Sequence, residues 1–229
     1  MGTLVLCPTR GRHHNAVDLL TSFEETAALE STQLVCVVDE DDPELDSYLQ
    51  ELPSQNVEIN ESIGSMVLAL NAAATLHATI GVYDYIGFVG DDHRFRTKGW
   101  DETFEKVLRD SGGGFIYGND LYQGVNLPTH VVMNASIVLA LGWMAPPFLK
   151  HLYVDDCWKV MGSSVNRLFY APEVVIEHLH PFAGKAEMDA GYARVNGPEM
   201  VEHDRTEFEK WLKGSAQSDI AKVRGILAL

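Results

Sequence analysis

The chain has 229 residues, of which 46% are hydrophobic and 22% are charged, and this length and composition are typical of one α/β domain with its own core. They exclude a disordered, collagen-like or disulfide-stapled protein. The 17 basic and 33 acidic residues give a net charge of −16. That charge repels a phosphate backbone and argues against broad nucleic-acid binding, whereas it suits a site for a divalent cation.

The cysteines and the N-terminal residues indicate where the protein works. The three cysteines lie far apart, without a C-x-x-C pair, which is typical of a reducing compartment. The apolar start of the chain is only a few residues long and is followed by Pro8 and two arginines, so it is too short for a signal peptide or a membrane span. We therefore expect a cytoplasmic protein without a membrane span.

The first 90 residues alternate between apolar runs and helical patterns. The expected strands are residues 3–7, 34–38, 57–59 and 85–89, and the helices between them are residues 15–29, 43–52 and 62–79. Continuous apolar runs of this kind are typical of parallel strands covered on both faces. Polar clusters follow three of the strands, at residues 9–14, 39–42 and 90–93. Because ligands bind at the carboxyl ends of such strands, we expect the clusters to form one site.

The second half of the chain is less regular. The expected elements are helices at residues 100–109, 135–141 and 155–161 and strands at residues 115–117, 129–133, 165–170 and 174–176. Residues 181–198 have the glycines of a loop, and residues 202–212 and 218–227 favour a helical tail. The sequence therefore predicts a single α/β domain with a mostly parallel, Rossmann-like sheet, helices on both faces and a helical C-terminal tail.

The cluster G-D-D-H at residues 90–93 offers two carboxylates and an imidazole directly after a buried strand. These groups suit a hard or borderline divalent cation, although the same residues also fit a polar turn in which Asp92 caps the next helix. His178 and His180 follow a later strand, two residues apart. Either could complete a metal shell, but most surface histidines bind nothing.

Asp155 and Asp156 stand at the start of a predicted helix, where acids commonly cap the helix. Alternatively, one of them is a general base that takes a proton from an acceptor hydroxyl. The sequence contains no G-x-G-x-x-G after its first strand, no G-x-x-x-x-G-K-[ST] and no G-x-S-x-G, which disfavours a Rossmann dehydrogenase, a P-loop enzyme and the common hydrolase elbow. A bound phosphate must therefore be held by a metal or by arginine.

Four short motifs stand at strand ends and at one helix start. They are P-T-R-G-R at residues 8–12, V-V-D-E-D at 37–41, F-V-G-D-D-H with a following G-W at 88–100, and D-D with Y-A-P and a histidine at 155–178. In order and spacing they resemble motifs of GT-A-type nucleotide-sugar glycosyltransferases, near the large family 2 group, with a metal motif similar to that of polypeptide GalNAc-transferases. Gly90, Asp155 and Leu70 depart from the family pattern. Because Gly90 precedes Asp91, the metal motif can be aligned in two ways, with either Asp91 and His93 or Asp92 alone as the ligands.

The resemblance implies a metal-dependent glycosyltransferase with a GT-A-like domain at residues 1–181. Its nucleotide-binding half would be about residues 1–95 and its acceptor half about 96–181, with a lid-like loop and helical tail at 182–229. The donor would be a nucleoside-diphosphate sugar, which the resemblance implies to be a UDP-sugar, and the acceptor hydroxyl would belong to a glycan, a protein or a small molecule. A nucleotidyltransferase or a non-catalytic nucleotide-sugar-binding module on the same fold is the alternative.

The resemblance also implies roles for particular residues. The donor would contact Thr9, Arg10, Arg12, Asp39, Asp41, Gly64, Asn71 and Asp91. Mn²⁺ or Mg²⁺ would be held by a set drawn from Asp91, Asp92, His93, His178 and His180. Asp156, with Asp155 beside it, would be the base if the reaction inverts the anomeric carbon. From its glycines and cations, residues 182–203 are predicted to be a lid that brings Lys185 or Arg194 to the donor diphosphate, or else an ordinary surface segment.

Overall fold

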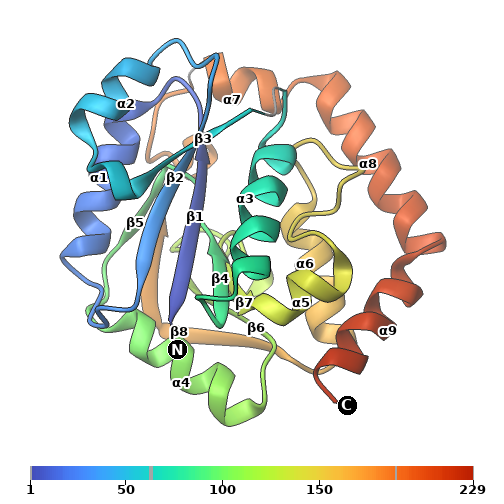
Figure 1. Cartoon of the computed structure of the whole chain (residues 1–229). Coiled ribbons are helices and arrows are strands. Elements are labelled where there is room, and N and C mark those ends of the chain that lie inside the picture. The colour runs from blue at the N-terminus through green and yellow to red at the C-terminus, as the bar shows by residue number, and fades with distance from the viewer. Residues whose placement is uncertain (1, 62–63, 189, 229) are drawn as a thin grey trace.

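The computed structural model describes residues 2–61, 64–188 and 190–228. Their strands form one sheet in the order β3-β2-β1-β4-β7-β6-β8-β5 (Figure 1). Strands β3, β2, β1 and β4 pair in parallel, and so do β6 and β8, whereas β7 and β5 run antiparallel to their neighbours. The sheet is therefore mostly parallel, as the apolar runs of the sequence predict.

The N-terminal half builds the parallel part of the sheet. Its strands are β1 (Thr3–Thr9), β2 (Gln33–Asp39), β3 (Val57–Asn60) and β4 (Tyr85–Phe88), and its helices are α1 (His13–Glu24), α2 (Leu45–Glu51) and α3 (Met66–Ile80), with a 3₁₀ turn at Ser54–Asn56. Helix α1 ends five residues before its predicted end, because the amides of Ala28 and Leu29 donate instead to the carboxylate of Asp101. Residues 62 and 63 of the predicted third helix lie outside the described residues, and α3 begins after Ser65, whose hydroxyl accepts from the Leu68 amide.

The C-terminal half adds the rest of the sheet and the tail. Its strands are β5 (His93–Phe95), β6 (Phe115–Asn119), β7 (Val131–Asn134) and β8 (Leu168–His178). Its helices are α4 (Trp100–Ser111), α5 (Ala135–Leu141), α6 (Val154–Ser164), α7 (Ala190–Val195), α8 (Pro198–Lys213) and α9 (Ala216–Ile226), with 3₁₀ turns at Gly124–Asn126 and Pro181–Ala183. Helices α8 and α9 are the predicted tail; Figure 1 shows them along one side of the domain.

Two hydrophobic cores cover the two faces of the sheet. Helices α1 and α4 pack on one face, where Leu19, Trp100 and Phe104 are buried. Helices α3, α5 and α6 pack on the other, and α9 lies against α5 and α6 with Val223 in that core. Burial on both faces explains why the central strands are continuously apolar, and it confirms the predicted helices on both faces.

The structure corrects the prediction at β5 and β8. Two separate strands were expected at residues 165–170 and 174–176, but β8 is a single strand that passes through Pro172. A bulge in its pairing with β6, between Gly118 and Asn119, lets the chain accommodate this proline, which has no amide hydrogen to donate. Strand β5 was not predicted, because the three residues H-R-F carry no apolar run.

The segment expected to be a loop at residues 181–198 contains helix α7, which lies in Figure 1 at the end of the sheet where β1 and β2 finish. Helix α7 is too short to give a clear periodic pattern in the sequence. Among the helices that the structure describes, none has the length and apolar character needed to cross a bilayer.

Candidate active site

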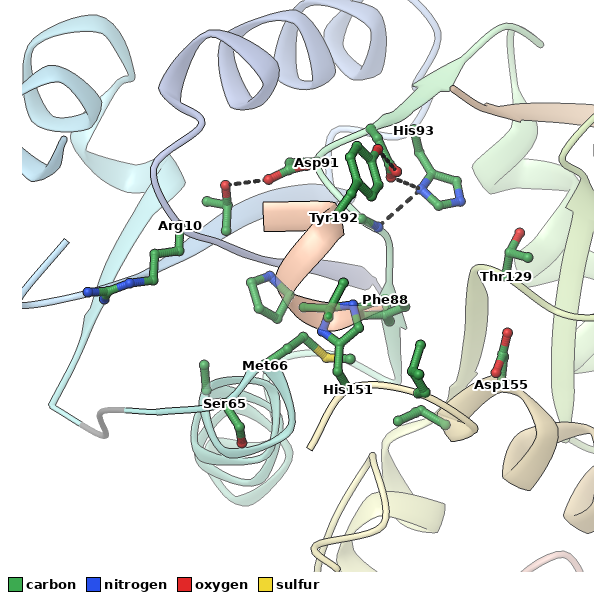
Figure 2. Close-up of a pocket in the computed structure, with 18 of the residues that line it drawn as sticks. Arg10, Ser65, Met66, Phe88, Asp91, His93, Thr129, His151, Asp155 and Tyr192 are labelled. Atoms are coloured by element: carbon green, nitrogen blue, oxygen red, sulfur yellow. Dashed lines mark hydrogen bonds and ion pairs between the residues drawn. The ribbon is translucent and has the colours of Figure 1, made fainter. Parts of the chain in front are cut away.

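A cavity of about 470 Å³ lies at the carboxyl ends of β1, β2 and β4 (Figure 2). Its wall continues through the first residues of α3, the loop before α6, and helix α7. The predicted site residues that line it are Thr9, Arg10, Arg12, Asp39, Gly64, Asp91, Asp92, His93, Asp155, His178 and His180. The fold thus brings the three polar clusters of the sequence, and both later motifs, to one place.

Asp92, His93 and His178 form the group best suited to hold a cation. One nitrogen or oxygen from each residue lies within 4.8 Å of the others. Strands β5 and β8 produce this arrangement, because His93 is paired with His178 across their antiparallel ladder. The two imidazoles stack with their ring centres 4.2 Å apart, and Nε2 of His178 lies 3.1 Å from Oδ2 of Asp92.

The protonation of this group is set by burial and by its mutual contacts. Burial would raise the pKa of Asp92, but hydrogen bonds from His178 and His93 outweigh it and hold the pKa well below its usual value. The pKa of His93 is lowered mainly by burial and secondly by the charge of the nearby His178. Nε2 of His93 and Nδ1 of His178 are buried without a hydrogen bond among the described residues. A carboxylate with a lowered pKa beside two buried ring nitrogens that have no partner among the described residues fits a divalent cation.

Asp91 has a different set of contacts. Its Oδ2 accepts from the Thr9 hydroxyl at 2.7 Å, and its Oδ1 accepts from the guanidinium of Arg12 at 3.1 Å. The Thr9 hydroxyl also meets the Tyr48 hydroxyl at 3.0 Å, and the Tyr48 hydroxyl accepts from the Arg12 amide. Burial, together with the charge of Asp92, raises the pKa of Asp91. Asp91 therefore fastens the loop after β1 to the loop after β4, and both of its carboxylate oxygens already accept hydrogen bonds.

Tyr192 of α7 lines the cavity beside the group formed by Asp92, His93 and His178. Its hydroxyl donates to Oδ2 of Asp92 at 2.5 Å, and its ring lies under the guanidinium of Arg12, 4.2 Å from ring centre to Cζ. Figure 2 shows its ring between Asp91 and His93. The residue is only 8% exposed. The short helix that carries it is thereby tied to the cavity by a hydrogen bond and a cation–π contact.

The paired acids at the start of α6 differ in position. Asp155 lines the cavity, and Figure 2 shows it below Thr129 on the wall away from Asp91. Burial, with the charge of Asp156, raises the pKa of Asp155 from 3.8 to about 7. The Asp155 carboxylate accepts from the Asp156 amide at 3.0 Å. Asp156 is half-buried beside the cavity wall and is not among the described lining residues.

The end of the cavity beside β2 is ordered by a chain of polar contacts. Asp39 accepts from the Asn60 amide group at 2.9 Å and from Arg10 at 3.2 Å. Arg10 in turn donates to Asp41 at 2.5 Å. Arg10 and Asp39 line the cavity, and Asp41 lies outside the described lining on the exposed side of Arg10. Asp41 thus acts on the cavity only through Arg10.

Two further predicted residues lie away from the described cavity wall. Asn71 accepts from the amides of Met144 and Ala145 and donates to the Ala145 carbonyl, so it holds the loop before α6. Lys185 pairs with Glu177 at 2.9 Å. The side chain of Arg194, the other predicted lid cation, lies outside the described part of the chain.

Sequence reasoning missed Tyr192, His130 and Asp204. His130 is buried beside His93, with ring centres 5.6 Å apart, and its Nε2 accepts from the Gly118 amide at 2.8 Å. Burial, and then the charges of His93 and His178, hold the pKa of His130 well below its usual value. A lone histidine before an apolar strand does not reveal these contacts in the sequence. The position of His130 becomes informative only once β5, β6 and β7 are placed.

The comparisons with solved structures identify the fold. The chain matches Staphylococcus aureus TarS with a TM-score of 0.59 and 15% identity, over 90% of this chain and 45% of that one. A shorter form of TarS, residues 1–349 in complex with UDP-GlcNAc, matches with a TM-score of 0.60 and 14% identity, over 85% of this chain and 64% of that one. The mannosyltransferase PcManGT from Pyrobaculum calidifontis, in complex with GDP-Man and Mn²⁺, matches with a TM-score of 0.59 and 11% identity, over 99% of this chain and 74% of that one.

These neighbours are GT-A glycosyltransferases. The expected GT-A-like α/β fold is thus confirmed. The chain spans less than half of the longer TarS chain. No protein-family model and no curated protein matches the sequence. At identities of 11–16% the likeness establishes the fold, and function has to be argued from the site.

Proposed function

We propose that the protein is a glycosyltransferase that moves a sugar from a nucleoside-diphosphate sugar, a UDP-sugar in the first instance, to an acceptor hydroxyl. The observation that carries the proposal is the pairing, across one cavity, of the Asp92–His93–His178 group with Asp155, whose pKa is about 7. The first group suits a diphosphate-bound cation, and the second suits a base that works near neutral pH. Each lies on a GT-A-like fold whose solved relatives include complexes with UDP-GlcNAc and GDP-Man.

The donor nucleotide would occupy the part of the cavity between the ends of β1 and β2. Asp39, already oriented by Asn60 and Arg10, offers carboxylate oxygens to the N–H groups of a base. Pro8 and Val37 supply apolar surface beside it. Arg12, near the cation group, would meet the negative charge of the diphosphate.

Asp92, His93 and His178 would hold the divalent cation, and His180 lies beside them with its ring 5.0 Å from that of His178. Nitrogen ligands favour Mn²⁺ over Mg²⁺, which prefers oxygen. When bound, the cation would neutralise charge on the diphosphate leaving group.

Asp155 would be the general base of an inverting reaction. Its carboxylate takes the proton from the acceptor hydroxyl while the hydroxyl oxygen forms a bond to the anomeric carbon. The bond from that carbon to the diphosphate breaks, and its electron pair leaves with the nucleoside diphosphate. We place this role on Asp155 and not on Asp156 because Asp155 lines the cavity. The acceptor would enter beside Thr129 and His151, which also line the cavity.

Residues 182–203 would be a lid over the donor. Tyr192 and Asn196 of this segment line the cavity, and Tyr192 already contacts the cation group. The lid would exclude water from the donor while the sugar is transferred. Lys185 would have to leave its ion pair with Glu177 to reach the diphosphate.

The proposal is tested by incubating the protein with UDP- and GDP-sugars, with and without Mn²⁺, and measuring release of the nucleoside diphosphate together with calorimetric binding. We expect binding that requires Mn²⁺ and slow hydrolysis in the absence of acceptor. Binding without any turnover, even with a panel of glycan, peptide and small-molecule acceptors, would instead indicate a nucleotide-sugar-binding module. Release of pyrophosphate from a nucleoside triphosphate would indicate a nucleotidyltransferase.

A further inference from the structure

A second group of metal-ligating side chains lies outside the cavity, where α1 begins and α2 ends. His13, His14 and Glu51 each place a nitrogen or oxygen within 4.8 Å of the others. None of the three lines the described cavity wall. His13 is mostly covered, with 13% of its side chain exposed, whereas His14 and Glu51 are exposed.

Glu44 fixes the orientation of the His13 ring. One oxygen of Glu44 lies 2.8 Å from Nδ1 of His13 and also accepts from the His13 amide at 3.1 Å. With its proton on Nδ1, the imidazole donates to Glu44 and presents the lone pair of Nε2 on its other side. Nε2 lies 3.4 Å from a carboxylate oxygen of Glu51. A carboxylate behind a histidine, holding the second nitrogen ready, is the arrangement that commonly supports a metal-bound imidazole.

The spacing of these atoms also suits a small divalent ion. Tetrahedral ligands at Zn–N and Zn–O distances of about 2.0–2.1 Å lie about 3.3 Å from each other, close to the 3.4 Å between His13 and Glu51. The ring of His14 lies against that of His13, with ring centres 3.7 Å apart. His14 is exposed, and one of its ring nitrogens lies within 4.8 Å of the ligand atoms of His13 and Glu51.

We propose that His13, His14 and Glu51 form a surface site for Zn²⁺ or a similar borderline divalent ion, with Glu44 orienting His13. Two imidazoles and one carboxylate are ligands that Zn²⁺ commonly takes, and a water would complete the shell. The site shares no ligand with the Asp92 group, and the inference does not rest on the proposed glycosyl transfer.

The site would tie the first turn of α1 to the last turn of α2. His13 follows Arg12, whose amide donates to the Tyr48 hydroxyl of α2, and Tyr48 also contacts Thr9. An ion that joins His13 to Glu51 therefore braces the loop of residues 9–13, which carries Thr9 and Arg12 to the cavity. Bound Zn²⁺ would stabilise the folded protein by mass action.

The test uses the full chain in which Asp92→Ala and His178→Ala together remove the cavity group. We expect this protein to bind one equivalent of Zn²⁺ by calorimetry. It should also bind one equivalent of Co²⁺, with the visible absorption band that is typical of tetrahedral Co²⁺. Adding His14→Ala or Glu51→Ala should abolish that equivalent and the band. Glu44→Gln should weaken Zn²⁺ binding by about 10–100-fold, the usual effect of losing such an orienting carboxylate.

Glu24→Ala, which removes an exposed acid at the other end of α1, is the matched control and should change nothing. His14 and Glu51 are exposed, so their variants are expected to keep the fold, and circular dichroism verifies this. The proposal is overturned if the cavity-disabled protein binds no Zn²⁺, or if its Zn²⁺ equivalent survives both His14→Ala and Glu51→Ala. Neither result would bear on glycosyl transfer, which is measured with Mn²⁺ in the unmodified protein.

Discussion

The hydroxyl of Tyr192 donates a hydrogen bond of 2.5 Å to Oδ2 of Asp92, so a residue of α7 occupies an oxygen of the carboxylate that we assign to the cation. The same oxygen lies 3.1 Å from Nε2 of His178. The guanidinium of Arg12 lies over the Tyr192 ring, with Cζ 4.2 Å from the ring centre. Tyr192 therefore links three parts of the proposed site: the cation group, the loop after β1 and the lid.

Tyr192→Phe should strengthen Mn²⁺ binding. The substitution removes a hydrogen bond to an ionised carboxylate, worth about 1.5 kcal/mol or a factor of about ten, that competes for an Asp92 oxygen. Calorimetric titration of Mn²⁺ measures the change. Tyr122→Phe, at an exposed tyrosine stacked on His180, is the control and should bind Mn²⁺ as the unmodified protein does. Equal or weaker Mn²⁺ binding by Tyr192→Phe would contradict the idea of competition.

If residues 182–203 form a lid, their cleavage by trypsin should depend on bound ligands. Trypsin cleavage after Lys185 should slow when UDP and Mn²⁺ are both present, because an ordered segment is a poor protease substrate. Band sequencing on a time course gives the rate at this site. Cleavage after Lys213, at the end of α8, serves as the internal reference. If both sites are cut at unchanged rates with the ligands present, residues 182–203 are an ordinary surface segment.

Asp92→Ala and His178→Ala should each abolish the Mn²⁺ dependence of nucleotide binding, since each removes a ligand of the proposed cation. Asp91→Asn should act differently: it weakens the contact with Arg12 and so lowers donor affinity, but it keeps the Mn²⁺ dependence. Calorimetry of UDP with and without Mn²⁺ separates the two effects. Loss of the Mn²⁺ dependence in Asp91→Asn but not in Asp92→Ala would place the cation on Asp91 instead.

The roles of the two acids on α6 are separated by a pair of matched substitutions. Asp155→Asn should reduce sugar transfer by about 10²–10⁴-fold, the usual contribution of general-base catalysis, with little change in donor affinity. Asp156→Asn alters a neighbouring carboxylate of the same kind outside the described cavity wall and should leave transfer within about threefold. Initial rates of nucleoside-diphosphate release with saturating donor compare them. A larger loss in Asp156→Asn would reverse the assignment.

The raised pKa of Asp155 gives a dependence on pH. Since only the carboxylate accepts a proton, kcat/KM should rise with pH and level off above about 7. The same shift affects stability: between pH 3.8 and about 7 the folded protein keeps a proton on Asp155 that the unfolded chain has released, so this group's contribution to the free energy of unfolding falls as the pH rises through that interval. Asp155→Asn should therefore gain stability relative to the unmodified protein as the pH rises from 4 to 7. Parallel urea-denaturation curves at the two ends of the interval would show no such gain if Asp155 were ionised throughout.

Much of the site could be predicted because the carboxyl ends of parallel strands lie at one edge of the sheet. Apolar runs identify β1, β2 and β4, and the polar residues that follow a strand must lie at its carboxyl end. Thr9, Asp39 and Asp92 could therefore be placed together before any contact was known. The periodicity of the tail also located α8 and α9 to within a few residues.

The remaining part depends on pairings that leave no local pattern. His93 meets His178 because a strand of three residues pairs antiparallel with the end of β8, and neither end shows a hydrophobic alternation. Tyr192 reaches Asp92 across 100 positions of sequence. Asp155 and Asp156 are identical in type and adjacent, so their separation into a lining and a non-lining residue follows from the direction in which α6 packs on β8.

Asp204 is the clearest case of a functional acid hidden in a charged helix, and it gives the last prediction. Its carboxylate is fully buried and accepts from the amides of Lys150, His151 and Leu152, at 3.0, 2.9 and 2.7 Å. This loop leads into α6 and carries His151 to the cavity wall. Burial would raise the pKa of Asp204, but contacts with His203 and the three amides outweigh it and lower the pKa.

Asp204→Ala should reduce the free energy of unfolding by about 2–4 kcal/mol, because it leaves buried amides without an acceptor. Glu207→Ala removes an acid from the same helix that pairs with Lys210 near the surface, and it should cost no more than about 1 kcal/mol. The stabilisation by Asp204 requires the carboxylate: it is complete above the ordinary pKa of 3.8 and is lost as the pH falls through the lower pKa of the folded state. Urea denaturation of both variants at pH 7 measures the difference. If Asp204→Ala were no less stable than Glu207→Ala, the three amides would have to find other acceptors, and Asp204 would have no part in holding the cavity wall.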